Sequence, residues 1–167
     1  MKIRYGLNHL RTLLVATVIV LLSGLAYAQI AAEPPPSAPS FTFSSLTGEQ
    51  FDMPGFNQDK PTLLYFWATW CPYCKKATPR VVALHNDYGE LIDVLAINVG
   101  INDSVALTKK YIQDYAITFP VMFDHDSNVS ASYGVFGTPV FVIVSADGGI
   151  LYRGHRYPDG LERALSL

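Results

Sequence analysis

The chain contains two cysteines, Cys71 and Cys74, three residues apart. Residues 62–67 form a continuous apolar run of strand length that leads into this pair, and a helical pattern follows it. Cys71 is therefore expected at a helix N-terminus, where unpaired backbone N–H groups favour a thiolate, and Lys75 and Lys76 add positive charge nearby. Because the thiolate is the species that attacks a disulfide, the spacing predicts a redox-active pair.

Other uses of the two thiols fit the sequence less well. A structural zinc site needs about four ligands, whereas the pair supplies two and the four histidines of the chain are scattered. A purely structural disulfide would close a loop so short that it removes little entropy from the unfolded chain. Inert buried cysteines would not need the proline, aromatic and lysine residues around them. We therefore expect redox chemistry that uses no metal and no cofactor.

Residues 1–28 predict an export signal. Three basic residues precede the uncharged apolar run 13–25, and the small-x-small sequence of residues 26–28 is typical of a cleavage site. The alternative is an uncleaved membrane anchor, since residues 12–32 carry no charge and approach the roughly 20 residues that span a bilayer. Both interpretations place the remainder of the chain outside the cytoplasm, in the periplasm or a similar compartment, where disulfides can form.

Charge and length restrict the partners of the exported part. The whole chain has 12 Lys and Arg against 14 Asp and Glu. Without the three basic residues of the signal, its formal net charge falls from −2 to −5. This acidic balance argues against nucleic acid as a partner. The remaining length suits one domain with a single core, which we expect to be a monomer.

The rest of the chain divides into a proline-rich linker over residues 29–40 and one domain over residues 41–167. Within the domain we expect strands at 41–43, 49–51, 62–67, 92–98, 120–123, 140–145 and 150–156, and helices at 72–88, 104–115, 128–133 and 159–167. Strands that alternate with helices and end in a hairpin imply an α/β fold, with a mixed central sheet flanked by helices on both faces.

Two motifs carry a resemblance to a known family. They are Phe66-Trp67-Ala68-Thr69-Trp70-Cys71-Pro72-Tyr73-Cys74-Lys75-Lys76 after the central strand and Gly137-Thr138-Pro139 before a later one. Together with the order of elements, they resemble the thioredoxin fold. The N-terminal β-hairpin and an inserted strand–helix unit at about residues 99–123 are similar to the exported TlpA/ResA type of thiol-disulfide oxidoreductase. The resemblance covers residues 41–167.

The resemblance implies roles for the two cysteines. Cys71 would be the nucleophile that attacks a substrate disulfide, and Cys74 would resolve the mixed disulfide. The partners would then be proteins that carry disulfides or dithiols, together with a membrane electron donor that keeps the pair reduced.

The resemblance also implies a substrate-binding surface. Trp70, Pro72 and Tyr73 would form an apolar lip around the sulfurs. The Thr138–Pro139 bond would be cis and lie beside the cysteines. The backbone of Thr138 would then pair with an extended substrate segment by strand addition.

Two positions depart from related proteins. Thioredoxin has a buried Asp six residues before the first cysteine, where this chain has Tyr65, which we expect to serve packing. Some members that act in cytochrome c maturation have a Glu three residues after the second cysteine, where this chain has Ala77. Both positions would supply a carboxylate that moves the proton of the resolving thiol. Their absence argues against a dedicated role on apocytochrome c, and leaves the deprotonation of Cys74 to water or another group.

Several functions use the same two sulfurs. The leading hypothesis is a disulfide reductase, and an oxidase or isomerase would run the same chemistry in the other direction. A peroxidase of the peroxiredoxin type would need a Thr three residues before the cysteine, where this chain has Ala68. A Cu(I) metallochaperone is the alternative from the binding class, with Met53 and Met122 as further soft ligands.

Overall fold

The structure is a computed structural model, and it describes residues 36–54 and 59–165. The predicted export signal (residues 1–28), most of the predicted linker and the last two residues of the predicted final helix lie outside the described residues. Among the helices in the described part of the chain, none combines the length and the apolar character that crossing a membrane requires.

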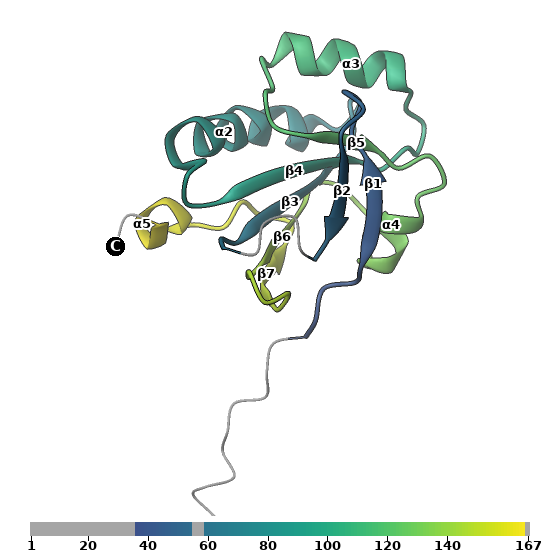
Figure 1. The fold of residues 1–167 in the computed structure, drawn as a ribbon. Helices are drawn as coiled ribbons and strands as arrows, with labels where there is room; N and C mark the ends of the chain where they lie inside the picture. Colours follow the sequence, from purple (N-terminus) through teal and green to yellow (C-terminus); the bar gives the residue numbers. More distant parts are fainter. Residues whose placement is uncertain (1–35, 55–58, 166–167) are drawn as a thin grey trace, which may run out of the picture. The chain divides into compact units, whose positions relative to one another are not determined.

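The elements follow the predicted order (Figure 1). The strands are β1 (Phe41–Ser44), β2 (Gln50–Met53), β3 (Thr62–Trp67), β4 (Asp93–Asn98), β5 (Val121–Phe123), β6 (Val140–Val144) and β7 (Ile150–Gly154). The helices are α2 (Pro72–Tyr88), α3 (Val105–Asp114), α4 (Asn128–Ser132) and α5 (Leu161–Leu165). The final helix begins two residues later than predicted and follows Gly160, whose φ of +81° lies in the left-handed region that favours glycine.

The central sheet is mixed, as the sequence predicts. Its strand order is β5-β4-β3-β6-β7, in which β3, β4 and β5 are parallel and β6 and β7 are antiparallel to their neighbours. Strands β1 and β2 form a separate antiparallel pair. All six residues of β3 are buried because the strand lies at the centre of the sheet and is covered on both faces. This burial explains its continuous apolar run.

Consecutive residues of β3 show which helices cover each face of the sheet. Tyr65 reaches the Cys74 carbonyl of α2, while the Phe66 ring packs at 5.3 Å, between centroids, on Tyr133 at the end of α4. Trp67 points back to the first face and contacts Tyr111 of α3 at 4.4 Å. Since neighbouring residues of a strand point to opposite faces, α2 and α3 cover one face and α4 lies against the other.

One edge of the sheet brings the two sequence motifs together. Strand β6 pairs antiparallel with β3, with Phe66 opposite Val140. The carboxyl end of β3 and the amino end of β6 therefore lie at the same edge. The cysteine segment that follows β3 and the Thr138–Pro139 loop that precedes β6 meet there.

The carboxyl end of the predicted linker pairs with the domain. Residues 36–38, which the sequence assigns to the linker, run along the β6–β7 turn: Ile150 N–H donates to the Pro36 carbonyl and Ala38 N–H donates to the Gly148 carbonyl, both at 2.9 Å. The Ala38 side chain is buried in the core. The proline-rich segment is therefore attached to the domain at its carboxyl end, which composition alone does not indicate.

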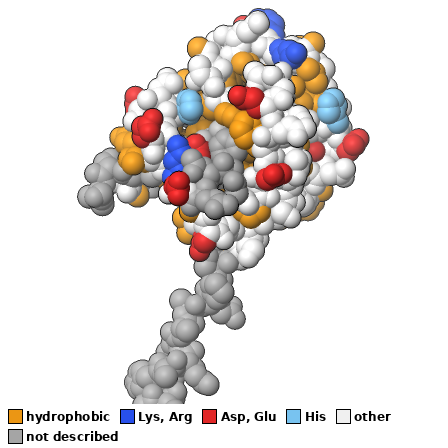
Figure 2. Space-filling view, viewed as in Figure 1, with side chains coloured by type: hydrophobic (Ala, Val, Ile, Leu, Met, Phe, Trp, Pro, Cys, Tyr) orange, Lys and Arg blue, Asp and Glu red, His pale blue; other side chains and the backbone are white. Residues whose placement is uncertain are grey.

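Charged side chains of both signs lie on the face of the molecule that Figure 2 shows. Figure 2 shows Lys and Arg on this face in small groups among acidic and uncharged residues.

Candidate active site

The two cysteines form a disulfide at the start of α2. Cys71 is the N-cap residue of the helix, and its Sγ accepts a hydrogen bond from the Cys74 N–H at 3.1 Å. Pro72 occupies the first turn, where a missing N–H costs nothing. No acidic residue lies in that turn. A sulfur at this position receives the partial positive charge of the helix N-terminus, which favours its ionised form once the disulfide is reduced.

Both sulfurs are nearly inaccessible while the disulfide is closed. Cys71 is 2% exposed and Cys74 is fully buried. Cys71 is therefore only slightly more exposed than Cys74. The predicted nucleophile is not an open thiol in this oxidised state.

The three residues predicted to form the lip differ in how they are held. Trp70 and Tyr73 are 49% and 68% exposed, which is high for aromatic side chains, and Pro72 is also exposed. The Trp70 indole Nε1–H donates to the Ile101 carbonyl at 2.8 Å, which fixes the ring against the segment before α3. These side chains flank the cysteines in the sequence and expose apolar area to solvent around a buried disulfide.

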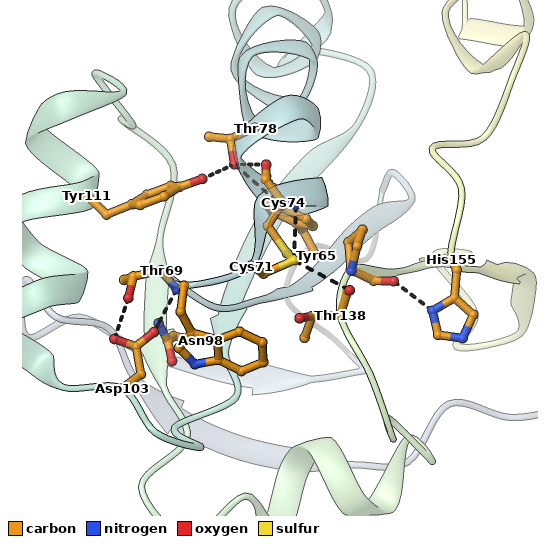
Figure 3. Close-up of a disulfide and its surroundings, with 12 residues drawn as sticks. Tyr65, Thr69, Cys71, Cys74, Thr78, Asn98, Asp103, Tyr111, Thr138 and His155 are labelled. Carbon is orange, nitrogen blue, oxygen red and sulfur yellow. Dashed lines mark hydrogen bonds between the residues drawn. A yellow bond between two sulfur atoms is a disulfide. The ribbon is translucent and has the colours of Figure 1, made fainter.

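The Thr138–Pro139 loop contacts the disulfide directly (Figure 3). The Cys71 Sγ lies 3.4 Å from the Thr138 carbonyl oxygen. A disulfide sulfur has no proton, so this is a close contact here, and a reduced Cys71 thiol can donate across it. The Thr138–Pro139 peptide bond is cis. Pro139 is buried, and its carbonyl lies 2.9 Å from His155 Nδ1, which must carry a proton because the carbonyl only accepts.

A chain of buried hydroxyl groups lies against the other side of Cys74 (Figure 3). The hydroxyls of Tyr65 and Thr78 both donate to the Cys74 carbonyl, at 3.1 and 2.9 Å. Thr78 Oγ1 also lies 3.0 Å from the Tyr65 hydroxyl and 2.9 Å from that of Tyr111. Burial raises the pKa of Tyr65 and Tyr111 well above the ordinary phenol value, so both remain neutral. They act as hydrogen-bond donors and not as bases at neutral pH.

The backbone just before the cysteines is fixed by Asp103. Its carboxylate accepts from the Thr69 N–H at 2.7 Å and from the Thr69 hydroxyl at 2.8 Å. It also accepts from the Asn98 side-chain amide and from the Ser104 N–H, both at 2.9 Å. One carboxylate thereby connects the end of β3, the end of β4 and the start of α3.

The described residues contain no cluster of three or more His, Cys, Asp and Glu side chains suited to a metal ion. The two methionines considered as copper ligands lie in the hydrophobic core, Met53 in β2 and Met122 in β5, at 3% and 9% exposed. A soft metal at this site would therefore rely on the two cysteine sulfurs.

Sequence reasoning identified the cysteines and the Thr138–Pro139 loop but missed the residues that support them. Thr78, Tyr111 and Asp103 had no assigned role, and Tyr65 was expected to serve packing. Tyr65 does pack, stacking on Phe141 at 5.1 Å between centroids, and it also donates to the Cys74 carbonyl. Partners 33 or 34 residues away, as between Thr78 and Tyr111 or Thr69 and Asp103, leave no local signal in a single sequence.

The fold and the site together define a thioredoxin-fold thiol-disulfide oxidoreductase. The chain belongs to the AhpC/TSA family, whose model matches residues 36–153. It is 28% identical over 131 residues to the thiol-disulfide oxidoreductase ResA of Bacillus thuringiensis subsp. konkukian, an alignment that covers 77% of this chain and 74% of that protein.

Solved structures give the same result. A putative thioredoxin from Neisseria meningitidis has a TM-score of 0.67 and 30% identity, covering 77% of this chain and 85% of its own. A secreted Mycobacterium tuberculosis disulfide oxidoreductase homologous to Escherichia coli DsbE has a TM-score of 0.62 and 25% identity, and the match covers 75% of this chain and 94% of that one. These likenesses confirm the predicted fold class and the ResA-like thiol-disulfide oxidoreductase with the Cys71–Cys74 pair.

Proposed function

We propose that this chain is an exported reductase of disulfides in extracytoplasmic proteins, with Cys71 as the nucleophile and Cys74 as the resolving cysteine. The observation that carries the proposal is the position of Cys71. Its sulfur accepts the Cys74 N–H at the N-terminus of α2 and lies 3.4 Å from the Thr138 carbonyl. A substrate disulfide paired with the Thr138 backbone would therefore be presented to a sulfur whose ionised form is favoured.

The reaction consists of two thiol–disulfide exchanges. The Cys71 thiolate attacks one sulfur of the substrate disulfide; a mixed disulfide forms, and the other substrate sulfur leaves as a thiolate that takes up a proton. The Cys74 thiolate then attacks the Cys71 sulfur and displaces the second substrate thiolate. Two electrons pass to the substrate, which ends as a dithiol, and the chain ends with the Cys71–Cys74 disulfide. A membrane electron donor would have to return two electrons for the next turnover.

Trp70, Pro72 and Tyr73 serve in this proposal as the surface on which the substrate lies. They are exposed next to the buried disulfide. A bound polypeptide would cover this apolar area, which favours docking.

Export is supported by the pattern of residues 1–28 and by the relative described as secreted. The test is a fusion of the full chain to a reporter that is active only outside the cytoplasm, followed by mass spectrometry of the recovered protein. A mature form that begins at Gln29 would support cleavage, and a full-length form in the membrane fraction would support the anchor. Reporter activity confined to the cytoplasm would contradict export.

Turnover of a protein disulfide tests the roles of the two cysteines. The wild type, reduced with dithiothreitol, is expected to reduce insulin catalytically. Cys71→Ser should be inactive, whereas Cys74→Ser should accumulate a mixed disulfide with its substrate through Cys71. Turnover by Cys71→Ser at the wild-type rate would contradict the assignment of the nucleophile.

The direction of electron flow is tested by the reduction potential, measured against glutathione. A value near that of thioredoxin, about −270 mV, supports a reductase, whereas a value near that of DsbA, about −120 mV, would support an oxidase or isomerase.

A peroxidase and a Cu(I) metallochaperone gain no support from the contacts of the described residues. The hydroxyl nearest to the position that a peroxidase requires belongs to Thr69 and donates to Asp103. Peroxide consumption by the purified protein tests the first function, and Cu(I) binding tests the second.

A further inference from the structure

A pocket of about 670 Å³ adjoins the Thr138–Pro139 loop. Its lining includes Phe136 and Gly137, which lead into the loop, and Arg153 and His155, which come from β7 and the residue after it. The His155 ring is tied to the Pro139 carbonyl, one residue from the carbonyl that contacts Cys71. The pocket and the disulfide therefore share a single loop, and a polypeptide that lies on this loop would be beside both.

The guanidinium group of Arg153 is fixed in this pocket. Its Nη2 donates to the Gly134 carbonyl at 2.6 Å and to the Tyr133 carbonyl at 3.0 Å, and its Nε donates to the Tyr133 carbonyl at 3.3 Å. These are the carbonyls at the end of α4. Three hydrogen bonds hold a side chain that would otherwise sample many rotamers, so little conformational entropy remains to be lost when a ligand binds.

The charge of Arg153 is not neutralised within the described part of the chain. The ion pairs there join Lys60 to Asp93, Lys110 to Asp114, and Arg80 to two acidic residues, and none involves Arg153. Its Nη1 has no described acceptor, so two N–H donors are available. A guanidinium that is held in place with free donors is suited to a carboxylate.

The neighbouring side chains fit the same ligand. The Phe136 ring is 99% exposed and offers an apolar surface at the mouth of the pocket. With Nδ1 of His155 donating to Pro139, its Nε2 is the ring nitrogen that remains for a ligand. A short carbon stem that ends in a carboxylate, as in Asp or Glu, matches an apolar ring and a guanidinium group that line the same pocket.

We propose that this pocket is a specificity subsite for a carboxylate of the substrate polypeptide, bound by Arg153, with Phe136 against its apolar stem. The subsite rests on the proposed function, because the polypeptide must first pair with Thr138 as a disulfide substrate. We commit to an acidic side chain near the reactive cysteine of the substrate as the source of this carboxylate. A C-terminal carboxylate has the same chemistry, and the peptides used in the test distinguish the two sources.

The test uses the full chain, reduced, and short peptides that contain one cysteine in a mixed disulfide. Each peptide carries a single Glu at one of the positions that flank the cysteine, and its partner carries Gln at the same position. All are acetylated and amidated, and a further Gln peptide keeps its free C-terminus. The rate constant kcat/KM is measured for each. At one position Glu should be favoured over Gln by about three- to tenfold.

Substitution of Arg153 distinguishes binding from structure. Arg153→Gln should bring the Glu-to-Gln ratio to about one, whereas loss of the α4 carbonyl contacts alone would change both rates together and leave the ratio unaltered. Arg156→Gln is the matched control, because it removes the same charge from an exposed residue that does not line the pocket. It should keep the wild-type ratio. In the wild type, added salt should reduce the preference, which provides a test that needs no variant.

The outcomes separate the two proposals. Four results would each overturn the subsite without contradicting the reductase. The first is equal rates for Glu and Gln peptides at every position, and the second is a preference for Glu that survives Arg153→Gln. The others are a preference for Glu that Arg156→Gln also removes, and a preference for Glu that does not change with salt. A preference seen only with the free C-terminus would assign the pocket to terminal carboxylates and overturn the side-chain subsite. Failure to reduce any peptide or insulin would contradict the reductase, and the subsite with it.

Discussion

The hydroxyl of Tyr65 donates a hydrogen bond to the carbonyl of Cys74 at 3.1 Å, and so joins the central strand β3 to the first turn of α2. The same carbonyl accepts from Thr78, whose hydroxyl also contacts Tyr65 and Tyr111. In thioredoxin this strand position holds a carboxylate. Here a neutral phenol fixes the backbone of the second cysteine, and its role is therefore positional.

Removal of the Tyr65 hydroxyl should weaken this connection without disturbing the core. Tyr65→Phe keeps the ring that stacks on Phe141. It removes one donor to the Cys74 carbonyl and leaves Thr78 with one partner fewer, so we expect the free energy of unfolding to fall by about 1–2 kcal/mol. Urea denaturation of the oxidised protein measures this change in the free energy of unfolding. Tyr88→Phe, whose hydroxyl makes no described hydrogen bond, is the control, and an equal effect of both variants would contradict the role.

A double-mutant cycle tests whether the hydroxyls act as one network. Thr78→Val removes the group that joins Tyr65 and Tyr111 while keeping nearly the same volume. Because the two residues share the Cys74 carbonyl, the effects of Tyr65→Phe and Thr78→Val should not add, and the interaction free energy should exceed about 0.5 kcal/mol. Additive effects would indicate independent contacts.

The reduced protein should have two thiols of unequal reactivity. Cys71 Sγ accepts a backbone N–H at the helix N-terminus, and Lys75 and Lys76 follow it in the first two turns of α2. We therefore expect its pKa to lie below the ordinary thiol value of about 8.5. Iodoacetamide should modify Cys71 before Cys74, and the rate should rise with pH through that lowered pKa. Lys75→Gln and Lys76→Gln should each move the midpoint upward. Equal modification of both thiols with an ordinary midpoint would contradict the proposed mechanism.

The sequence was sufficient for the elements whose patterns are local. The apolar run before Cys71 predicted β3 because all six of its residues are buried. The helical pattern predicted over residues 104–115 places the start of α3 correctly, and there the Ser104 hydroxyl accepts from the Leu107 N–H as the N-cap. The cysteine spacing and the Gly-Thr-Pro sequence predicted two segments of the site, which the pairing of β3 with β6 brings to one edge.

The supporting contacts could not be predicted because they depend on tertiary distance. Asp103 lies in the loop before α3, and its sequence neighbours give no sign that its carboxylate accepts from the N–H of Thr69, 34 residues away. The attachment of residues 36–38 to the β6–β7 turn is similar: four prolines indicate an extended chain, but not the strand edge beside which it lies. Hydroxyl and carboxyl groups have no periodicity that reveals a distant partner.

Asp103→Asn should loosen the segment before the cysteines. The carboxylate accepts four hydrogen bonds, two of them from Thr69, and an amide can accept at only one of its two terminal atoms. We expect the free energy of unfolding to fall by about 1–3 kcal/mol. Asp114→Asn is the matched control on the same helix–loop unit; it removes an exposed ion pair with Lys110, worth about 0.3–0.5 kcal/mol. Equal effects in urea denaturation would contradict the role of Asp103.

Stability should decrease in mild acid because of His85. Burial lowers the pKa of this histidine, and Lys60 lowers it further against the opposing effect of Asp93. Its Nδ1 is buried without a described partner, and its ring lies edge-on to Phe119 at 5.4 Å between centroids. In the unfolded chain His85 takes up a proton near the ordinary histidine pKa of about 6.5, whereas in the folded chain it takes up a proton only at lower pH. Between the two pKa values the unfolded state therefore binds more protons than the folded state, so a fall in pH stabilises the unfolded state relative to the folded one.

The contribution of His85 is accordingly present above the unfolded-state pKa and is lost as pH falls toward the lower folded-state pKa. Urea midpoints measured between about pH 7.5 and about pH 5 should show a steeper loss for the wild type than for His85→Gln, which does not titrate. The comparison uses the slopes of the two curves, because the substitution also changes the packing on Phe119 at every pH. Parallel curves would show that His85 takes up its proton equally in both states.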